Sequence, residues 1–371
     1  MAKKFDYYEI RHLLKDYPNA YYYMIIGERS NGKTYSALDY ALERNAKNGS
    51  QFAYIRRYGE DIRKKNLSNL LSGHIENGEI ARLFNNSWSS VNYTGSKFYL
   101  ERKSEDGESE QCDEPCGFAF DLNSMEHYKS ISFPKVKTII FDEFMSRGGY
   151  LPNEWMLFAN TLSTIIRQRD DVKIIMLGNT VNKYCPYFQE MGLTHIKEQK
   201  PGTVDVYNYA DTNLQVVCEY TGSSAKKGGK ASDVYFAFDN PELKMITGGE
   251  WEIAIYPHLN TKIRPMDIVS NFFIDFNDEL LHGQIIVNDS GPFVFIHAKT
   301  TPIKDEDVDI IYTSKPDERW NHRMCMTKHA DKLTAFILKC VRENKVFYST
   351  NEIGEVFRNY LMWSDSFSIR N

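Results

Sequence analysis

The eight residues from Gly27 to Thr34 constrain the fold of this chain more than any other segment. They read Gly-Glu-Arg-Ser-Asn-Gly-Lys-Thr and match the pattern G-x-x-x-x-G-K-[ST] in full. An apolar run over 21–26 precedes them, and a helical pattern that stops near Gly49 follows. A strand before this pattern and a helix after it are the context that a phosphate-binding loop requires, whereas a glycine-containing turn matching by chance is the alternative.

Each residue type in this loop suits phosphate binding. The glycines allow backbone N–H groups to close around phosphate oxygens, and the helix N-terminus adds a favourable dipole. Lys33 would reach the β- and γ-phosphates, and Thr34 would hold Mg²⁺. We therefore expect ATP and Mg²⁺ as cofactors. The expected nucleotide-binding residues of the loop are Gly27, Glu28, Arg29, Ser30, Asn31, Gly32, Lys33 and Thr34.

A second apolar run, 138–141, ends in the acids Asp142 and Glu143. Ligands of α/β sheets lie at the carboxyl ends of strands, so Asp142 would bind Mg²⁺ there through water. Glu143 would polarise an attacking water, and this pairing favours hydrolysis over phosphate transfer to another substrate. Alone, such a strand end is commonly structural; the loop at 27–34 makes the nucleotide interpretation the better one.

For five further polar residues, the sequence allows either a functional or a structural role. Asn179 ends another apolar run and would either sense the γ-phosphate or cap a turn. Arg167 and Arg169 end a helical pattern, where they would either act as an arginine finger on a neighbouring subunit or interact with the helix dipole. Arg56 and Arg57 follow a predicted strand and could meet phosphate, DNA or solvent.

Strands alternate with helical patterns over the first 200 residues, which predicts an α/β fold with a mostly parallel sheet and helices on both faces. We expect a P-loop ATPase domain at 1–200, a linker region at 201–244 and a smaller C-terminal α/β domain at 245–371. The linker expectation rests on Lys200-Pro201-Gly202 and on the Gly/Ser/Lys segment 221–230. Lys226, Lys227 and Lys230 of this segment are candidates for DNA contact, and a solvated linker is the alternative. Residues 91–122 read as a hairpin-like insertion.

Charge and hydropathy exclude several classes of protein. Lys and Arg number 45 against 50 Asp and Glu, and this net charge of −5 excludes a uniformly basic nucleic-acid-binding surface but not a local one. With 42% hydrophobic residues, wholesale disorder is excluded. No apolar run approaches the roughly 18 residues of a membrane span, so we expect no membrane association.

Seven short segments together resemble a known family. They are GERSNGKT at 27–34, FAYIRRY at 52–58, TIIFDEF at 138–144, LPNE at 151–154, TIIRQR at 164–169, LGNT at 177–180 and PYF at 186–188. These segments resemble the DNA-packaging ATPases of small podophages, the phi29-like group. The resemblance is specific over about residues 20–190 and weaker beyond.

This resemblance implies an ASCE-class ATPase that acts as a homomeric ring, a pentamer in the family. Such a ring docks on the portal of an empty prohead in the host cell cytoplasm and pumps double-stranded DNA inward. Arg29 matches the family's P-loop arginine, and Arg167 matches its trans-acting finger, which ranks Arg167 above Arg169. Whether a scaffold RNA mediates portal docking, as in some relatives, is left open.

The resemblance also implies a C-terminal domain similar to an RNase H-type nuclease that has lost its active site. A two-metal nuclease needs several carboxylates that converge on one face. No metal-cage spacing exists among the candidates Asp239, Asp267, Asp275, Asp278, Glu279 and Asp289, so scattered surface acids are the preferred interpretation.

Two other classes of function are weighed against the motor. A GTPase switch would want a guanine-reading N-K-x-D, but residues 182–185 read Asn-Lys-Tyr-Cys and lack the acid. That leaves another P-loop enzyme, such as a kinase. A non-catalytic assembly factor with a vestigial loop need not keep Lys33, Thr34, Asp142 and Glu143 together.

Overall fold

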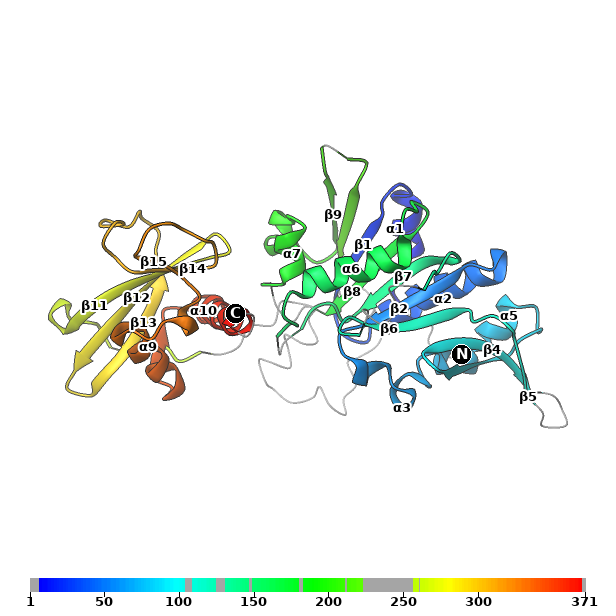
Figure 1. The fold of residues 1–371 in the computed structure, drawn as a ribbon, viewed down its shortest axis with the longest axis horizontal. Coiled ribbons are helices and arrows are strands. Elements are labelled where there is room, and N and C mark those ends of the chain that lie inside the picture. Colours follow the sequence, from blue (N-terminus) through cyan, green and yellow to red (C-terminus); the bar gives the residue numbers. More distant parts are fainter. Residues whose placement is uncertain are drawn as a thin grey trace. The chain divides into compact units, whose positions relative to one another are not determined.

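The fold is known from a computed structural model that describes residues 7–103, 109–124, 131–146, 149–179, 183–210, 212–222, 256–259 and 261–368. The chain divides into two compact units (Figure 1). The first comprises Met1–Arg147 and Asn153–Glu252, and the second comprises Gly148–Pro152 and Ile253–Asn371. Among the described helices, none has both the length and the apolar character needed to cross a membrane.

Within the described residues, ten strands form the sheet of the first unit. Their spatial order is β3 (Ser90–Thr94), β4 (Lys97–Lys103), β6 (Gly117–Asp121), β2 (Gln51–Arg56), β7 (Val136–Asp142), β8 (Lys173–Asn179), β1 (Tyr22–Gly27), β10 (Gln215–Tyr220) and β9 (Thr203–Asn208), with β5 (Ser109–Gln111) beside β4. All neighbours from β6 to β10 pair in parallel, while β3, β4, β5 and β9 join antiparallel. The mostly parallel sheet predicted from the sequence is confirmed.

The helices α2 (Lys33–Asn48) and α6 (Glu154–Ile166) cover opposite faces of this sheet. The connections β1–α2–β2 and β7–α6–β8 cross the sheet in opposite directions, so right-handed crossovers put their helices on opposite sides. Packing agrees, because Ile140 of β7 lies in one core cluster with Leu38 of α2. The next residue, Phe141, stacks on Phe158 of α6 with ring centroids 5.0 Å apart.

The described part of the first unit also contains shorter helices, namely α1 (Arg11–Asp16), α3 (Lys64–Leu67), α4 (Ser72–Glu76), α5 (Glu79–Leu83) and α7 (Pro186–Glu190). In the sequence, α3, α4 and α5 lie between β2 and β3. The segment 91–122, which we expected to be an insertion, supplies β3, β4 and β6. Since β6 pairs in parallel with β2, this segment extends the main sheet.

The sheet also continues into the region 201–244 that we expected to be a linker. Strand β10 pairs in parallel with β1, and β9 folds back against β10. Val216, Val217 and Cys218 are fully buried, which explains why this stretch belongs to the core. The linker interpretation is therefore wrong for 203–220; residues 223–244 lie outside the described chain.

The second unit contains a smaller mixed sheet. Its described strands are ordered β15 (His322–Met324), β14 (Ile311–Thr313), β11 (Ile268–Phe276), β12 (Glu279–Asn288), β13 (Gly291–Ala298) and β16 (Val346–Tyr348). The strands β11, β12 and β13 form an antiparallel meander, and the outer pairings are parallel. The helices α9 (Lys332–Arg342) and α10 (Asn351–Ser368) follow.

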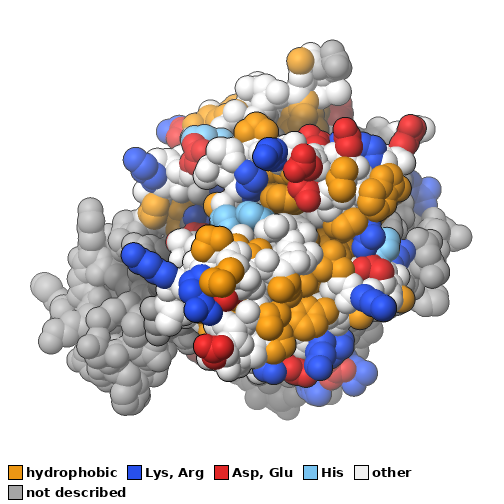
Figure 2. All heavy atoms as spheres, turned by 90° about the vertical axis from the view of Figure 1, so that its left-hand side faces the viewer, with side chains coloured by type: hydrophobic (Ala, Val, Ile, Leu, Met, Phe, Trp, Pro, Cys, Tyr) orange, Lys and Arg blue, Asp and Glu red, His pale blue; other side chains and the backbone are white. Residues whose placement is uncertain are grey.

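Both helices pack on one face of this sheet. Tyr312 of β14 shares a hydrogen bond of 2.6 Å with Thr334 of α9, and the ring of Phe276 on β11 lies 5.6 Å from that of Tyr360 on α10. The strand residues that alternate with these point to the other face, where aromatic and histidine rings meet. Figure 2 views this unit and shows histidines among hydrophobic side chains on its surface.

Candidate nucleotide-binding site

The phosphate-loop motif forms the turn between β1 and α2, as expected. Ser30 and Gly32 have φ of 58° and 93°, so the chain turns tightly before the helix begins at Lys33. Gly27 is required by a close approach, because a Cβ there would lie 1.8 Å from Oγ1 of Thr221. The same hydroxyl accepts a hydrogen bond of 3.1 Å from the Asn31 amide, which ties the loop to the end of β10.

Lys33 is almost fully buried, with 6% of its surface exposed. Its ammonium donates to the carbonyl oxygens of Gly27 and Glu28 at 3.3 and 2.5 Å and to Oδ1 of Asn31 at 3.1 Å. Burial lowers the pKa of Lys33 to about 8, against the opposing effect of the Asp142 and Glu28 carboxylates. The loop thus holds a partly desolvated cation that is suited to attract phosphate.

Thr34 and Asp142 meet although they are 108 residues apart in the sequence. The Thr34 hydroxyl donates to Oδ2 of Asp142 at 3.0 Å, and the buried Tyr54 hydroxyl donates to the same oxygen at 2.8 Å. A hydroxyl and a carboxylate at one point are the oxygen ligands that Mg²⁺ prefers, so these residues fit the metal. Tyr54 was missed by the sequence analysis, because its place in an apolar strand indicated only a core residue.

Glu143 directly follows β7 and has an unusual backbone, with φ of 57°. Its side chain is 56% exposed, and its Oε2 lies 2.6 Å from Nη2 of Arg56. Arg56 is the last residue of β2, the strand next to β7. Its Nη2 also lies 3.7 Å from Oδ2 of Asp61. Arg56 is thus paired with carboxylates beside the cavity, and the choice between phosphate, DNA and solvent for it stays a prediction.

Asn179 ends β8 and lies beside Lys33, with 3.4 Å between the amide Oδ1 and the ammonium. These groups border a cavity of about 410 Å³ at the carboxyl ends of β1, β7 and β8. The cavity is lined by Arg29, Ser30, Asn31, Gly32, Lys33, Thr34, Tyr35, Asp142, Glu143, Leu177, Gly178 and Asn179. The structure thus brings most of the predicted site residues together around one cavity. Gly27 and Glu28 do not line it, but their carbonyl oxygens accept hydrogen bonds from Lys33.

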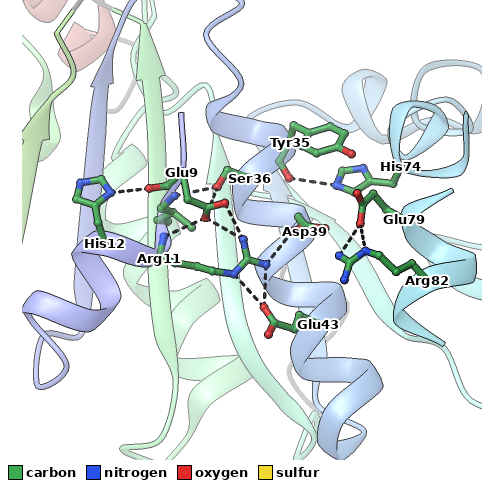
Figure 3. A network of polar contacts seen from close by, with 11 residues as sticks. Glu9, Arg11, His12, Tyr35, Ser36, Asp39, Glu43, His74, Glu79 and Arg82 are labelled. Atoms are coloured by element: carbon green, nitrogen blue, oxygen red, sulfur yellow. Dashed lines mark hydrogen bonds and ion pairs between the residues drawn. The ribbon is translucent and has the colours of Figure 1, made fainter. Parts of the chain in front are cut away.

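Contacts with neighbouring segments hold α2 on two of its sides (Figure 3). On one side Arg11 forms ion pairs with Asp39 and Glu43 of α2 at 2.7 and 2.8 Å. On the other, the ring of Tyr35 stacks on His74 of α4, with centroids 3.8 Å apart, and burial lowers the pKa of His74. Tyr35 lines the cavity, so this stack fixes one of its walls.

Arg57 does not face solvent, although its neighbour Arg56 does in part. Its guanidinium lies 2.8 Å from Glu154 in an ion pair whose side chains are 6% and 1% exposed. An arginine in this position is not available to DNA, so that alternative for Arg57 is wrong. The basic residues Lys226, Lys227 and Lys230, also candidates for DNA contact, lie outside the described residues.

Arg167 and Arg169 lie at the edge of the sheet opposite the cavity, because α6 runs back from the end of β7 to the start of β8. Arg169 donates to the backbone carbonyls of Phe133, Pro134 and Val136 around the start of β7 and to those of Ile165 and Ile166 at the end of α6. Arg167 is exposed, with one hydrogen bond of 3.0 Å to the Ile131 carbonyl. Arg169 is thus structural, and Arg167 stays available to another molecule.

The second unit holds the carboxylates that were considered as remnants of a nuclease site. Asp275 is the last but one residue of β11, Asp278 lies in the turn that follows, and Glu279 begins β12. Asp267 directly precedes β11 and Asp289 directly follows β12, while Asp239 lies outside the described chain. In the described part of the chain, no group of three or more His, Cys, Asp or Glu residues could hold a metal ion. The nuclease-like interpretation stays a prediction.

Comparisons with known proteins support the fold and the family of this chain. The DNA packaging protein of Bacillus phage B103 is 34% identical over 172 residues, which are 46% of this chain and 47% of that protein. This chain therefore matches about half the length of that relative. Solved structures of the Phi-28 gp11 DNA packaging motor and of the bacteriophage Phi-29 genome packaging motor assembly have TM-scores of 0.54 and 0.53. The Phi-28 motor protein is 17% identical, and the match covers 97% of this chain and 98% of that chain. The Phi-29 protein is 22% identical, and the match covers 95% of this chain and 99% of that chain. Both structures show a similar fold.

The family model described as podovirus DNA encapsidation protein (Gp16) matches residues 1–208. This span is more than half of the 371 residues and contains the loop, Asp142, Glu143 and Asn179. The resemblance expected from the sequence is confirmed, and the chain belongs to the podovirus DNA encapsidation protein (Gp16) family.

Proposed function

We propose that this chain is an ATP-hydrolysing motor that moves double-stranded viral DNA into a preformed prohead. The observation that carries the proposal is the cavity in which Lys33, Thr34, Asp142, Glu143 and Asn179 meet. Family membership supports packaging as the process that hydrolysis drives.

In this proposal the chain's own residues bind and orient ATP for attack by water. Lys33 and the loop bind the phosphates, while Thr34 and Asp142 hold Mg²⁺, which neutralises phosphate charge when bound. Glu143 accepts a proton from the attacking water as general base, and Asn179 orients the γ-phosphate. Before this, Glu143 must leave Arg56, with which it is paired here.

The motor acts as a homomeric ring, which we take to be a pentamer from the family. Arg167 then completes the active site of the neighbouring subunit, an assignment supported by its exposed position far from the cavity of its own chain. The proposed partners are double-stranded DNA and the portal of the prohead in the host cell cytoplasm; a scaffold RNA is a further candidate. The second unit would be the vestigial nuclease-like domain.

Phosphate release by the purified protein tests the proposal. ATP should be hydrolysed in preference to GTP, and double-stranded DNA with proheads should stimulate the rate. Glu143→Gln should bind ATP and Mg²⁺ normally yet hydrolyse about 10²–10³-fold more slowly, because only the water-polarising group changes. Equal use of GTP would favour another P-loop enzyme, and ATP binding without turnover would favour an assembly factor. Normal turnover by Glu143→Gln would remove Glu143 from the mechanism.

A further inference from the structure

We propose that Arg57 is a positioning residue for hydrolysis, which holds the backbone of Glu143 in the conformation from which its carboxylate acts. The inference deepens the proposed function and rests on it. It concerns the main chain at Glu143, whereas the side chain of Glu143 is paired with Arg56.

The guanidinium of Arg57 bridges the segment after β7 and the first turn of α6. Nη1 donates to the carbonyl oxygen of Glu143 at 3.1 Å, and Nη2 donates to that of Phe144 at 2.7 Å. Two further donors reach the Glu154 carboxylate, with Nε at 2.8 Å from Oε2 and Nη2 at 2.9 Å from Oε1. Only the planar fork of an arginine satisfies both carbonyls and a carboxylate at once.

Arg57 is itself held in place. Glu154 is 2% exposed, and its Oε1 accepts a further hydrogen bond of 2.8 Å from the buried Tyr187 hydroxyl. The Tyr187 ring lies edge-on to those of Phe141 and Phe144 at 5.6 and 5.8 Å. Because packed rings and a buried ion pair leave the guanidinium little freedom, it is a rigid support for the peptides that it contacts.

Glu143 needs such a support for two reasons. Its φ of 57° is unfavourable for a residue with a side chain, so the surrounding structure must maintain it. Its side chain is 56% exposed, so burial does not fix the carboxylate. The backbone that Arg57 holds therefore decides where the carboxylate can reach, and a misplacement of about 1 Å can cost about 100-fold in rate.

The test is steady-state and single-turnover ATP hydrolysis by the full chain carrying Arg57→Lys, which keeps the charge but loses the fork. We expect kcat to fall about 10- to 100-fold while KM and ATP affinity change less than about twofold. In a Glu143→Gln background the same substitution should cause no further loss, because the group that it positions is already gone. Arg44→Lys is the matched control, since Arg44 donates to the Lys137 carbonyl at 3.1 Å and contacts neither Glu143 nor the loop.

Two results would overturn the inference: an unchanged kcat in Arg57→Lys, or an equal fold-loss with and without Glu143→Gln. If Arg57→Lys does not fold, Tyr187→Phe replaces it, with a loss of a few-fold expected in kcat alone. Failure of the wild-type protein to hydrolyse ATP would instead refute the proposed function, so the two failures are distinguishable.

Discussion

At the scale of single residues, the central feature of the candidate site is Lys33, a cation that the protein itself buries. Lys33 exchanges water for carbonyl and amide oxygens of its own loop, with Nζ between 2.5 and 3.4 Å from four acceptors. These acceptors are neutral, so the ammonium remains without a full countercharge in direct contact. The phosphates of ATP would supply that charge.

Lys33→Ala should therefore weaken ATP binding strongly and abolish nucleotide-dependent function, because the phosphates lose their buried countercharge. Isothermal titration with ATP and Mg²⁺ measures this directly, and we expect affinity to fall by at least about 100-fold, equal to about 2.7 kcal/mol. Lys47→Ala is the control, since Lys47 is an exposed lysine in the last turn of the same helix. Retained affinity in Lys33→Ala would show that phosphate binds elsewhere.

At the scale of elements, the direction of α6 separates its two ends. Its N-terminus lies near Glu143, and its C-terminus carries Arg167 to the far edge of the sheet. Arg167 does not line the cavity of its own chain, so the proposed finger role requires a second subunit.

Arg167→Ala should bind ATP but hydrolyse it poorly, and mixing should reveal action in trans. In a ring that also contains Glu143→Gln subunits, an Arg167→Ala subunit keeps its own Glu143 and receives the arginine of its neighbour. Two nearly inactive proteins should then regain hydrolysis in the mixture, measured as phosphate release against mixing ratio. No recovery at any ratio, with exchange of subunits verified, would count against the trans role.

On the face of the second sheet away from α9 and α10, the histidine His282 should make stability depend on pH. The ring of His282 stacks on that of Phe273 with centroids 4.7 Å apart and lies 4.7 Å from the His297 ring. Lys299 directly follows β13, the strand that carries His297. Burial, together with the charges of His297 and Lys299, lowers the pKa of His282 to about 4. The folded unit thus favours neutral His282, while the unfolded chain takes up a proton near pH 6.5.

The stability from neutral His282 should be complete above about pH 6.5 and lost as the pH falls toward 4, by about 1–3 kcal/mol. Urea unfolding at pH 7 and pH 5 measures it. His282→Gln should reduce the difference between the two values, and His12→Gln, in the first unit, should not. An unchanged pH dependence in His282→Gln would show that other groups control acid stability.

At the scale of the whole molecule, charge limits how the chain can meet DNA. The net charge of −5 requires that any DNA contact use a local group of basic residues. A packaging motor must accept every genome sequence, so phosphates rather than base edges should be bound.

DNA binding should therefore be independent of sequence and strongly dependent on salt. For about six phosphate contacts, affinity should fall by about 1,000-fold between about 50 and 200 mM salt. Fluorescence anisotropy on two duplexes of unrelated sequence would measure both properties. A salt-insensitive preference for one duplex would contradict the electrostatic mode of contact.

The sequence by itself predicted those features of this protein that arise from residues close together in the chain. The loop at 27–34, the helix after it and the strand that ends at Asp142 were all predictable, since motif spacing and hydrophobic period express them directly. The parallel sheet with helices on both faces followed from the alternation of these elements.

Only the tertiary structure decided the contacts between residues distant in sequence. Tyr54 reaches Asp142 over 88 residues, and Thr221 reaches Asn31 over 190. The same holds for β10, which pairs with β1 although the two strands are far apart in the sequence. This pairing is not visible in the local pattern, so the segment was interpreted as a linker. Arg56 and Arg57 look equivalent in sequence, yet one is paired at the cavity and the other is buried against Glu154, because neighbouring strand-end residues point in different directions. Hydrophobic period reports which side of an element is buried, but it carries no information about which distant group meets a side chain there.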